Sequence, residues 1–464
     1  MTKYDYMTDK KQLYILLFAT TTSAFLTPFM GSAVNVALPI IAKELSMTAL
    51  AIGWVATAFL LAAAITLVPL GRLADIYGRK RIFLYGAGIF TAASLLCIWS
   101  SGQTFLIVMR AIQGIGGAMI FSTGTAMLVS AYPPGDRGKI LGINIAAVYI
   151  GLTVGPFVGG LLTEHFGWRY IFVFTAFLGS IVIVLTTGMI KEEWVGAKGE
   201  RFDLVGSLLY AIALFAIMYG VSLLPSPMAV LLIVLGLICF IFFVFRQLKI
   251  PSPLLNIRLF LDNKVFAFSN LAALINYLAT FAVTFLLSLY LQHIKMLTPS
   301  QTGLVLVAEP IVQAFFSPLA GRLSDRYEPR IISSLGMALN VIGLIPLIFI
   351  HNDTSIHYIL ICLIILGIGF ALFSSPNVNA TMSSVENKFY GIASATLGTM
   401  RLVGQMLSMG ITMLVFAIII GNHAISETNS PLLLQSTKII FIILTVICTA
   451  GILASLARGR VHEK

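Results

Sequence analysis

The stretch GRLADIYGRKR, from Gly71 to Arg81, has a near copy in GRLSDRYEPR, from Gly321 to Arg330. Each copy follows the second of six apolar runs, provided that two runs near Phe215 and Leu235 are set aside. Two loops that had converged by chance would not be expected at matching places in two halves of a chain. The sequence therefore predicts a duplicated unit of six helices, and membrane proteins built from such repeats place a binding site between them.

The composition places these units in a membrane. Of the 464 residues, 58% are hydrophobic and only 10% are charged, whereas a soluble domain carries roughly 25% charged residues. A helix needs about 20 apolar residues to cross the hydrocarbon layer. Fourteen runs of this kind are centred near Ser23, Leu60, Ile89, Gly116, Ile150, Leu178, Phe215, Leu235, Ala279, Ile311, Val341, Leu366, Ser408 and Thr445. We expect an all-α integral membrane protein with two six-helix bundles, residues 1–192 and 251–464, and two extra linking transmembrane helices in residues 193–250.

The net charge of +11 is divided into small basic groups between the apolar runs. If the N-terminus lies inside, 23 of the 29 lysines and arginines fall in inner segments. Four lie outside, namely Lys43, Arg169, Lys295 and Lys438, and two lie within spans, namely Arg110 and Arg401. This asymmetry follows the positive-inside rule. It predicts a multi-pass protein of the cell membrane with both termini cytoplasmic, surrounded by lipid and without a nucleic-acid partner.

Further motifs follow the first loop in a fixed order. LIVMRAIQGIGGA runs from Leu106 to Ala118, GLTVGPFVGG runs from Gly151 to Gly160, and the pair Trp168 and Arg169 comes next. NVALP, from Asn35 to Pro39, precedes the loop. With the fourteen apolar runs, this set resembles the fourteen-helix drug/proton antiporter branch of the major facilitator superfamily, over essentially the whole chain. The resemblance implies a major facilitator fold and export of small amphipathic molecules.

The two repeated loops are expected to control gating. In the resemblance, the loop latches the inner side of the two bundles. The residues that match are Gly71, Asp75, Gly78, Arg79, Gly321 and Asp325. The alternative is that the loop charges only anchor the chain at the inner surface.

The fifth apolar run carries small residues at every fourth position. Gly151, Gly155 and Gly159 form one face without side chains, which lets another helix approach closely, and Pro156 bends the helix by removing a backbone hydrogen bond. The resemblance implies that this face seals or hinges against the opposite bundle and sets the direction of exchange. Ordinary small-residue packing is the alternative.

Three ionisable residues lie within spans, where they are costly and face protein or water. The resemblance links Arg110 to proton transfer and matches Arg401 to an arginine of the penultimate helix. Glu309 is the acidic residue that lies deepest, and it is our candidate for the main proton-coupling group. Snorkelling or structural ion pairs for the arginines, and a permanently neutral carboxyl, are the alternatives. Further candidates for the substrate cavity are Asn35, Gln113, Gln313, Tyr149 and Tyr277.

One position departs from the branch. Met30 stands where the first helix of this branch usually carries an aspartate, five residues before Asn35. An acid that could carry a proton or bind a cation is therefore missing at this position. Its absence argues against proton coupling through this helix and favours a neutral or anionic substrate over a dication. An importer or proton-independent facilitator of the same fold therefore remains open, as does a receptor or scaffold that moves nothing.

Catalytic and cofactor signatures are missing from the sequence. No P-loop or nucleophile elbow occurs, and the six histidines have no metal-ligand spacing. We expect no enzyme activity, cofactor or metal. The expected partners are a small-molecule substrate and the proton, and the expected state is a monomer.

Overall fold

The computed structural model describes residues 9–224, 226–386, 390–421 and 430–459, except for the side chains of 134–139 and 390–392. Lys3 and Lys464, which bear on where the termini lie, fall outside the described residues. Sixteen helices occur in this part of the chain: α1 (Lys10–Glu44), α2 (Ala49–Tyr77), α3 (Arg79–Ile98), α4 (Gln103–Ala131), α5 (Pro134–His165), α6 (Arg169–Met189), α7 (Leu204–Ser222), α8 (Pro227–Lys249), α9 (Ile257–Asp262), α10 (Lys264–His293), α11 (Pro299–Leu306), α12 (Ala308–Arg326), α13 (Pro329–Ile348), α14 (Ile356–Ser383), α15 (Tyr390–Ile419) and α16 (Ser430–Ala457).

Fourteen of the described segments are long and apolar enough to span a membrane, which confirms the expected number. The tenth span, Pro299–Arg326, consists of two helices, α11 and α12, separated at Val307. The short helix α9 precedes the ninth span. Neither feature was expected from hydropathy. Because fourteen is an even number, the start of α1 and the end of α16 lie on the same face of the molecule.

Local sequence explains where the helices begin. Asp9 accepts a hydrogen bond from the Lys11 amide at the start of α1. Thr298 and Gln301 form a capping box at the start of α11, with Pro299 at its first position. Such caps satisfy amides that have no partner inside the helix.

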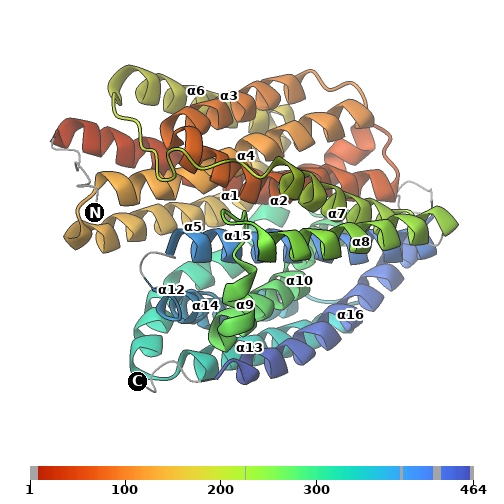
Figure 1. Cartoon of the computed structure of the whole chain (residues 1–464). Coiled ribbons are helices and arrows are strands. Elements are labelled where there is room, and N and C mark those ends of the chain that lie inside the picture. The colour runs from red at the N-terminus through yellow and green to blue at the C-terminus, as the bar shows by residue number, and fades with distance from the viewer. Residues whose placement is uncertain (1–8, 225, 387–389, 422–429, 460–464) are drawn as a thin grey trace.

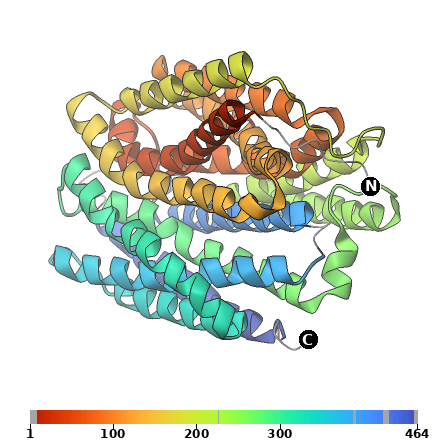
Figure 2. The same ribbon diagram turned by 90° about the vertical axis from the view of Figure 1, so that its left-hand side faces the viewer.

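The helices form two bundles, one from α1 to α6 and one from α10 to α16, which lie side by side in Figures 1 and 2. In the first, α1 packs on α5, α2 and α3 pack on α4, and α3 packs on α6. In the second, α14 packs on α12 and α13, and α10 and α13 pack on α16. Close approach depends on small residues, as membrane helices require: a methyl group at Gly116 would come within 2.5 Å of the Phe90 nitrogen.

The hairpin α7–α8 lies across the junction of the two bundles (Figure 1). The Tyr210 hydroxyl of α7 donates to the Ala64 carbonyl of α2 at 3.1 Å, and it also interacts with Thr399 of α15. A methyl group at Gly410 of α15 would come within 2.9 Å of Met218. α7 therefore touches a helix of each bundle along the same seam.

Candidate functional site

Hydrogen bonds join the two bundles on the face opposite the termini. Ser288 and Gln292 of α10 donate to the backbone carbonyls of Asn35 and Val36 in α1, each at 2.8 Å. The Glu164 carboxylate at the end of α5 accepts from the Ser300 amide of α11 at 3.0 Å. Backbone groups of one bundle thus take partners from the other, and this face is closed.

The glycines of the fifth span have two different neighbours. A methyl group at Gly151 would come within 2.5 Å of the Phe25 carbonyl oxygen, and Gly155 and Gly159 likewise lie directly against α1, in their own bundle. Two other residues of the same motif reach the opposite bundle. The Pro156 carbonyl lies directly against Gly303 of α11, and a methyl group at Gly160 would come within 2.5 Å of the Pro299 carbonyl oxygen. The motif thus packs on both bundles: Gly151, Gly155 and Gly159 on α1, and Pro156 and Gly160 on α11.

A polar and aromatic cluster joins the bundles between α5 and the helices α10, α12, α14 and α15. The Tyr149 hydroxyl of α5 lies 3.5 Å from the Ser374 hydroxyl of α14, and it also interacts with Ser317 of α12. The Arg401 guanidinium of α15 lies over the Tyr277 ring, 5.3 Å from its centroid. The rings of Tyr277 and Phe370 meet edge to face at 5.4 Å.

This cluster, which we call the cross-bundle cluster, therefore consists of Tyr149, Tyr277, Ser317, Phe370, Ser374 and Arg401. The structure brings together Tyr149 and Tyr277, which the sequence proposed for the substrate cavity, and Arg401, which it proposed for proton coupling. Sequence reasoning missed Ser317, Ser374 and Phe370. A serine or phenylalanine inside an apolar run carries no signal of its own, and only the meeting of helices identifies it.

Arg110 and Gln113 lie elsewhere. Arg110 is fully buried, donates to the Val55 carbonyl and to the Gln113 side chain, and lies over the Phe59 ring. Gln113 in turn donates to Ser94 at 2.7 Å. Both side chains are thus held between α2, α3 and α4, away from the cross-bundle cluster.

Glu309 lies in the first turn of α12, just after the break at Val307. The residue is half-buried, and its carboxylate has no hydrogen bond or ion pair to any described residue. Gln313, one turn on, is buried and its carbonyl accepts from Ser317 of the cross-bundle cluster. Asn35 is buried at the closed face between α1 and α10, and Met30 is fully buried.

The loop of the first repeat is held by the segment that links α6 to α7, residues 190–203, called here the linking segment. Asp75 pairs with Arg79 at 2.7 Å, and Arg79 donates to Ser130 of α4 at 2.5 Å. The Arg79 amide donates to the Trp194 carbonyl, and the Ala197 amide donates to the Asp75 carbonyl. The described hydrogen bonds of Asp75 and Arg79 thus stay within α2, α3, α4 and the linking segment.

The far end of the linking segment is fixed to the hairpin. Asp203 caps α7 and accepts from Arg246 and Gln247 of α8. Burial acts to raise the pKa of this carboxyl, but the hydrogen bonds from Arg246, Gly206 and Gln247 outweigh it and lower the pKa below its usual value. Asp203 therefore stays charged at neutral pH, and its ion pair holds the hairpin to the linking segment.

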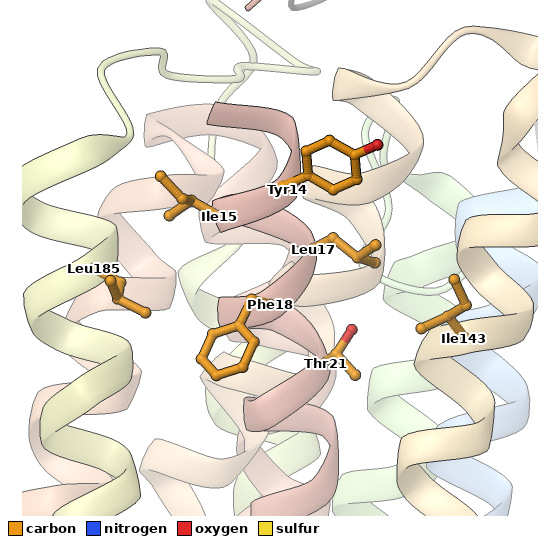
Figure 3. A pocket seen from close by; sticks show the side chains of 7 residues that line it. All are labelled: Tyr14, Ile15, Leu17, Phe18, Thr21, Ile143 and Leu185. Atoms are coloured by element: carbon orange, nitrogen blue, oxygen red, sulfur yellow. The ribbon is translucent and has the colours of Figure 1, made fainter. Parts of the chain in front are cut away.

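Two hollows occur in the first bundle. A cavity of about 20 Å³ lies between α1, α4 and α5, beside Thr20, Ser23 and Asn144. A wider apolar groove of about 580 Å³ lies on the outside of α1, α5 and α6, and Tyr14, Phe18 and Leu185 are among the side chains that line it (Figure 3). Within the described residues, no group of three or more histidine, cysteine, aspartate or glutamate side chains could hold a metal ion.

Comparison with known proteins agrees with this architecture. The Major Facilitator Superfamily matches residues 20–248 and 270–464. The riboflavin transporter RibZ of Clostridioides difficile is 31% identical over 84% of this chain and 85% of its own length. The multidrug resistance protein Stp of Mycobacterium tuberculosis is 30% identical over 86% of this chain and 74% of its own length.

Solved structures agree on the fold. A mutant of the peptide transporter POT in complex with alafosfalin has a TM-score of 0.73 at 14% identity and covers 98% of this chain and 96% of its own. A bacterial homologue of the lysosomal transporter Spinster has a TM-score of 0.66 at 18% identity and covers 97% of this chain and 98% of its own. The matches extend over both bundles. The chain is therefore a multi-pass transporter, not an enzyme, and it belongs to the Major Facilitator Superfamily.

Proposed function

We propose that this protein is a secondary active transporter that exports small amphipathic molecules from the cell by proton antiport and alternating access. The observation that carries the proposal is the cross-bundle cluster, in which Tyr149 of one bundle meets Ser317 and Ser374 of the other. A ligand between the bundles would contact both, so that binding and rearrangement of the bundles are linked.

The closed face opposite the termini supports alternating access. Described hydrogen bonds between α1 and α10, and between α5 and α11, close the face opposite the termini. With both termini cytoplasmic, as the distribution of basic residues predicts, the outer face is the closed one. Labelling from outside intact cells of cysteines placed at Lys3 and Lys464 tests this orientation, and we expect no labelling at either position.

We propose Glu309 as the main proton-coupling group. A carboxylate without a partner inside a membrane protein is costly, while the amides at the start of α12 favour its charged form. These opposing influences allow the group to take up and release a proton as water reaches it from one side or the other. Arg110 and Arg401 remain candidates for a supporting role, although neither forms an ion pair with Glu309 among the described residues.

The experiment uses purified protein in proteoliposomes with an imposed pH gradient. Glu309→Gln keeps the size of the side chain but cannot titrate, so we expect loss of pH-driven accumulation with substrate binding and downhill exchange retained. Asp262→Asn, at an exposed position in α9, is the matched control and should transport normally. If Glu309→Gln still accumulates substrate with unchanged pH dependence, coupling lies elsewhere or is absent.

The relatives suggest the first compounds to test. RibZ carries the name of a riboflavin transporter, and Stp that of a multidrug resistance protein. We propose that this chain likewise takes drug-like or flavin-like molecules. Uptake of riboflavin and of a panel of amphiphiles into inverted vesicles would measure the range.

A proton-independent facilitator or importer of the same fold is the second candidate, and Met30 is the observation that favours it. The side chain is fully buried where the related branch carries an acid. Proton flux measured beside substrate flux in the same vesicles separates the two, because a facilitator moves substrate without acidifying or alkalinising the lumen. Absence of any flux would favour the receptor or scaffold alternative.

A further inference from the structure

Three arginines lie within spans or at the end of one. Arg110 and Arg458 are fully buried and donate to neutral acceptors, whereas Arg401 is half-buried. Arg110 donates to Val55 and Gln113. Arg458, fully buried at the end of α16, donates to the Ser455 carbonyl and hydroxyl and to the Asn377 side chain at 3.0 Å. Both are fixed by neutral acceptors and have structural partners on more than one nitrogen.

Arg401 differs from both. It is the twelfth residue of the 30-residue α15, about 17 Å from its start at 1.5 Å per residue. The structure describes one contact for its guanidinium, the Tyr277 ring, and no hydrogen bond or ion pair with any described residue. A guanidinium presents five N–H donors. At this half-buried position they have no acceptor among the described residues and are open to a ligand.

The surroundings of Arg401 are aromatic and hydroxylic. Tyr277 and Phe370 form an edge-to-face pair, and the Tyr149 hydroxyl lies near Ser317 and Ser374. The side chains that influence Tyr149 electrostatically include Arg401 and Tyr277 but no carboxylate. The cross-bundle cluster thus carries positive charge, aromatic surface and hydroxyls.

We propose that Arg401 is the anion subsite of the transport cavity, and that the substrate is a planar aromatic or heteroaromatic molecule with one acidic group. The carboxylate or ionised group would take the N–H fork of Arg401, which matches a carboxylate in a bidentate manner. The ring would pack against Tyr277 and Phe370, while the hydroxyls of Tyr149, Ser317 and Ser374 offer hydrogen bonds to its polar edge. This inference rests on the proposed transport function and adds the charge and shape of the substrate.

The test measures binding to purified protein without a gradient, by calorimetry and ligand-induced thermal stabilisation. Three probes share one ring system and differ in charge: 2-naphthoate, 2-naphthamide and 2-naphthylmethylammonium. We expect 2-naphthoate to bind at least about tenfold more tightly than the amide, a difference of ~1.4 kcal/mol, and the ammonium to bind least. Equal affinity for the carboxylate and the amide in the unchanged protein overturns the proposal, and so does the absence of binding by all three.

Variants locate the preference. Arg401→Gln should remove the advantage of the carboxylate while leaving amide binding nearly unchanged, and Arg401→Lys should retain part of it, since an ammonium offers a point charge without the fork. Arg258→Gln, at an exposed position, is the matched control and should keep the preference. If Arg401→Gln keeps the preference, the anion subsite lies elsewhere.

Binding and transport are separated by this design. If 2-naphthoate binds through Arg401 but no compound crosses the membrane, the subsite stands and the proposed transport function fails. If riboflavin or another neutral compound is transported while the three probes show no preference for charge, the transport function stands and the anion subsite fails. Comparison of the three probes on the unchanged protein needs no variant, so a folding defect of Arg401→Gln does not block the test.

Discussion

The two copies of the repeated loop have nearly the same sequence but different surroundings. In the first, Asp75 pairs with Arg79 four residues later, and Arg79 reaches Ser130. In the second, Pro329 stands at the position equivalent to Arg79, and Asp325 instead accepts a hydrogen bond from the Asn379 side chain at 3.2 Å. With proline in place of arginine, the second loop lacks the ion pair, and its aspartate accepts a hydrogen bond from a neutral side-chain amide of α14 instead.

The linking segment deepens the difference. Gly78 has a φ of 122°, and the Glu193 carboxyl lies 2.6 Å from the place where a side chain would begin. Glu193 also accepts from the Lys80 amide and pairs with Arg81. The equivalent residue in the second copy is Glu328, with a φ of −52°. The first copy is thus shaped to hold the linking segment, and a shared motif does not imply a shared partner.

The largest expected effect concerns the hairpin, which the linking segment fastens to the first bundle. If α7 moves with that bundle, a disulfide between Trp54→Cys of α2 and Tyr219→Cys of α7, whose rings lie 6.0 Å apart, should leave transport intact. A disulfide between Met218→Cys of α7 and Gly410→Cys of α15 should arrest transport, because it ties the two bundles together.

Both cross-links require a background in which the four free cysteines, Cys97, Cys239, Cys362 and Cys448, are replaced. The readout is vesicle transport before and after oxidation, and a reducing agent should restore activity to the α7–α15 pair. Arrest by the α2–α7 pair instead would mean that the hairpin belongs to the second bundle.

The second prediction compares the two aspartates directly. Asp75→Asn removes the charge that Arg79 pairs with, and we expect turnover to fall about tenfold, equivalent to ~1.4 kcal/mol on the barrier, with substrate affinity unchanged. Asp325→Asn keeps the size of a side chain whose bond is to a neutral amide, so its turnover should stay near normal. Transport by Asp75→Asn at the normal rate would reduce the first loop to an inner-surface anchor.

Gly78 allows a third comparison, through stability. Gly78→Ala forces a side chain into the left-handed region and against Glu193, and we expect a loss of about 1–3 kcal/mol in stability, seen as a lower unfolding temperature. Gly321→Ala is the control, since the nearest atom to its added methyl group is a serine hydroxyl at 3.0 Å. Equal shifts in the two variants would show that the linking segment does not depend on Gly78.

The spans could be predicted from hydropathy because each crossing needs a long apolar run, and such a run is visible in the local sequence. The positions of Arg110, Glu309 and Arg401 within spans were also readable from the sequence. Their surroundings were not: Gln113 turns toward Ser94 rather than toward the second bundle, and only the packing of α3 on α4 decides this. The attachment of residues 190–203 was hidden for the same reason, since a polar loop does not reveal its distant partner.

The smallest expected effect comes from giving the second loop the arginine of the first. Pro329→Arg places an arginine four residues after Asp325, as in the first copy. A pair at this spacing contributes about 0.3–0.5 kcal/mol. Pro329 is buried at the start of α13, so the arginine must turn outward to reach Asp325, and we expect at most a slight rise in unfolding temperature. The double variant Asp325→Asn with Pro329→Arg should lose that gain, and a gain that persists would come from the loss of proline instead.

The hairpin α7–α8 also bears on how the protein meets its lipid surroundings. Duplication of six helices gives two related flanks, one where α2 meets α15 and one where α5 meets α11 and α12. At the first flank, α7 covers the junction and α8 lies outside it (Figure 1). The side chains of Phe242 and Phe245 in α8 are exposed and would face the bilayer. At the second, no additional described helix lies over the junction. In a bilayer, acyl chains would therefore reach the boundary between the bundles on one flank only, although the two halves share a repeated sequence.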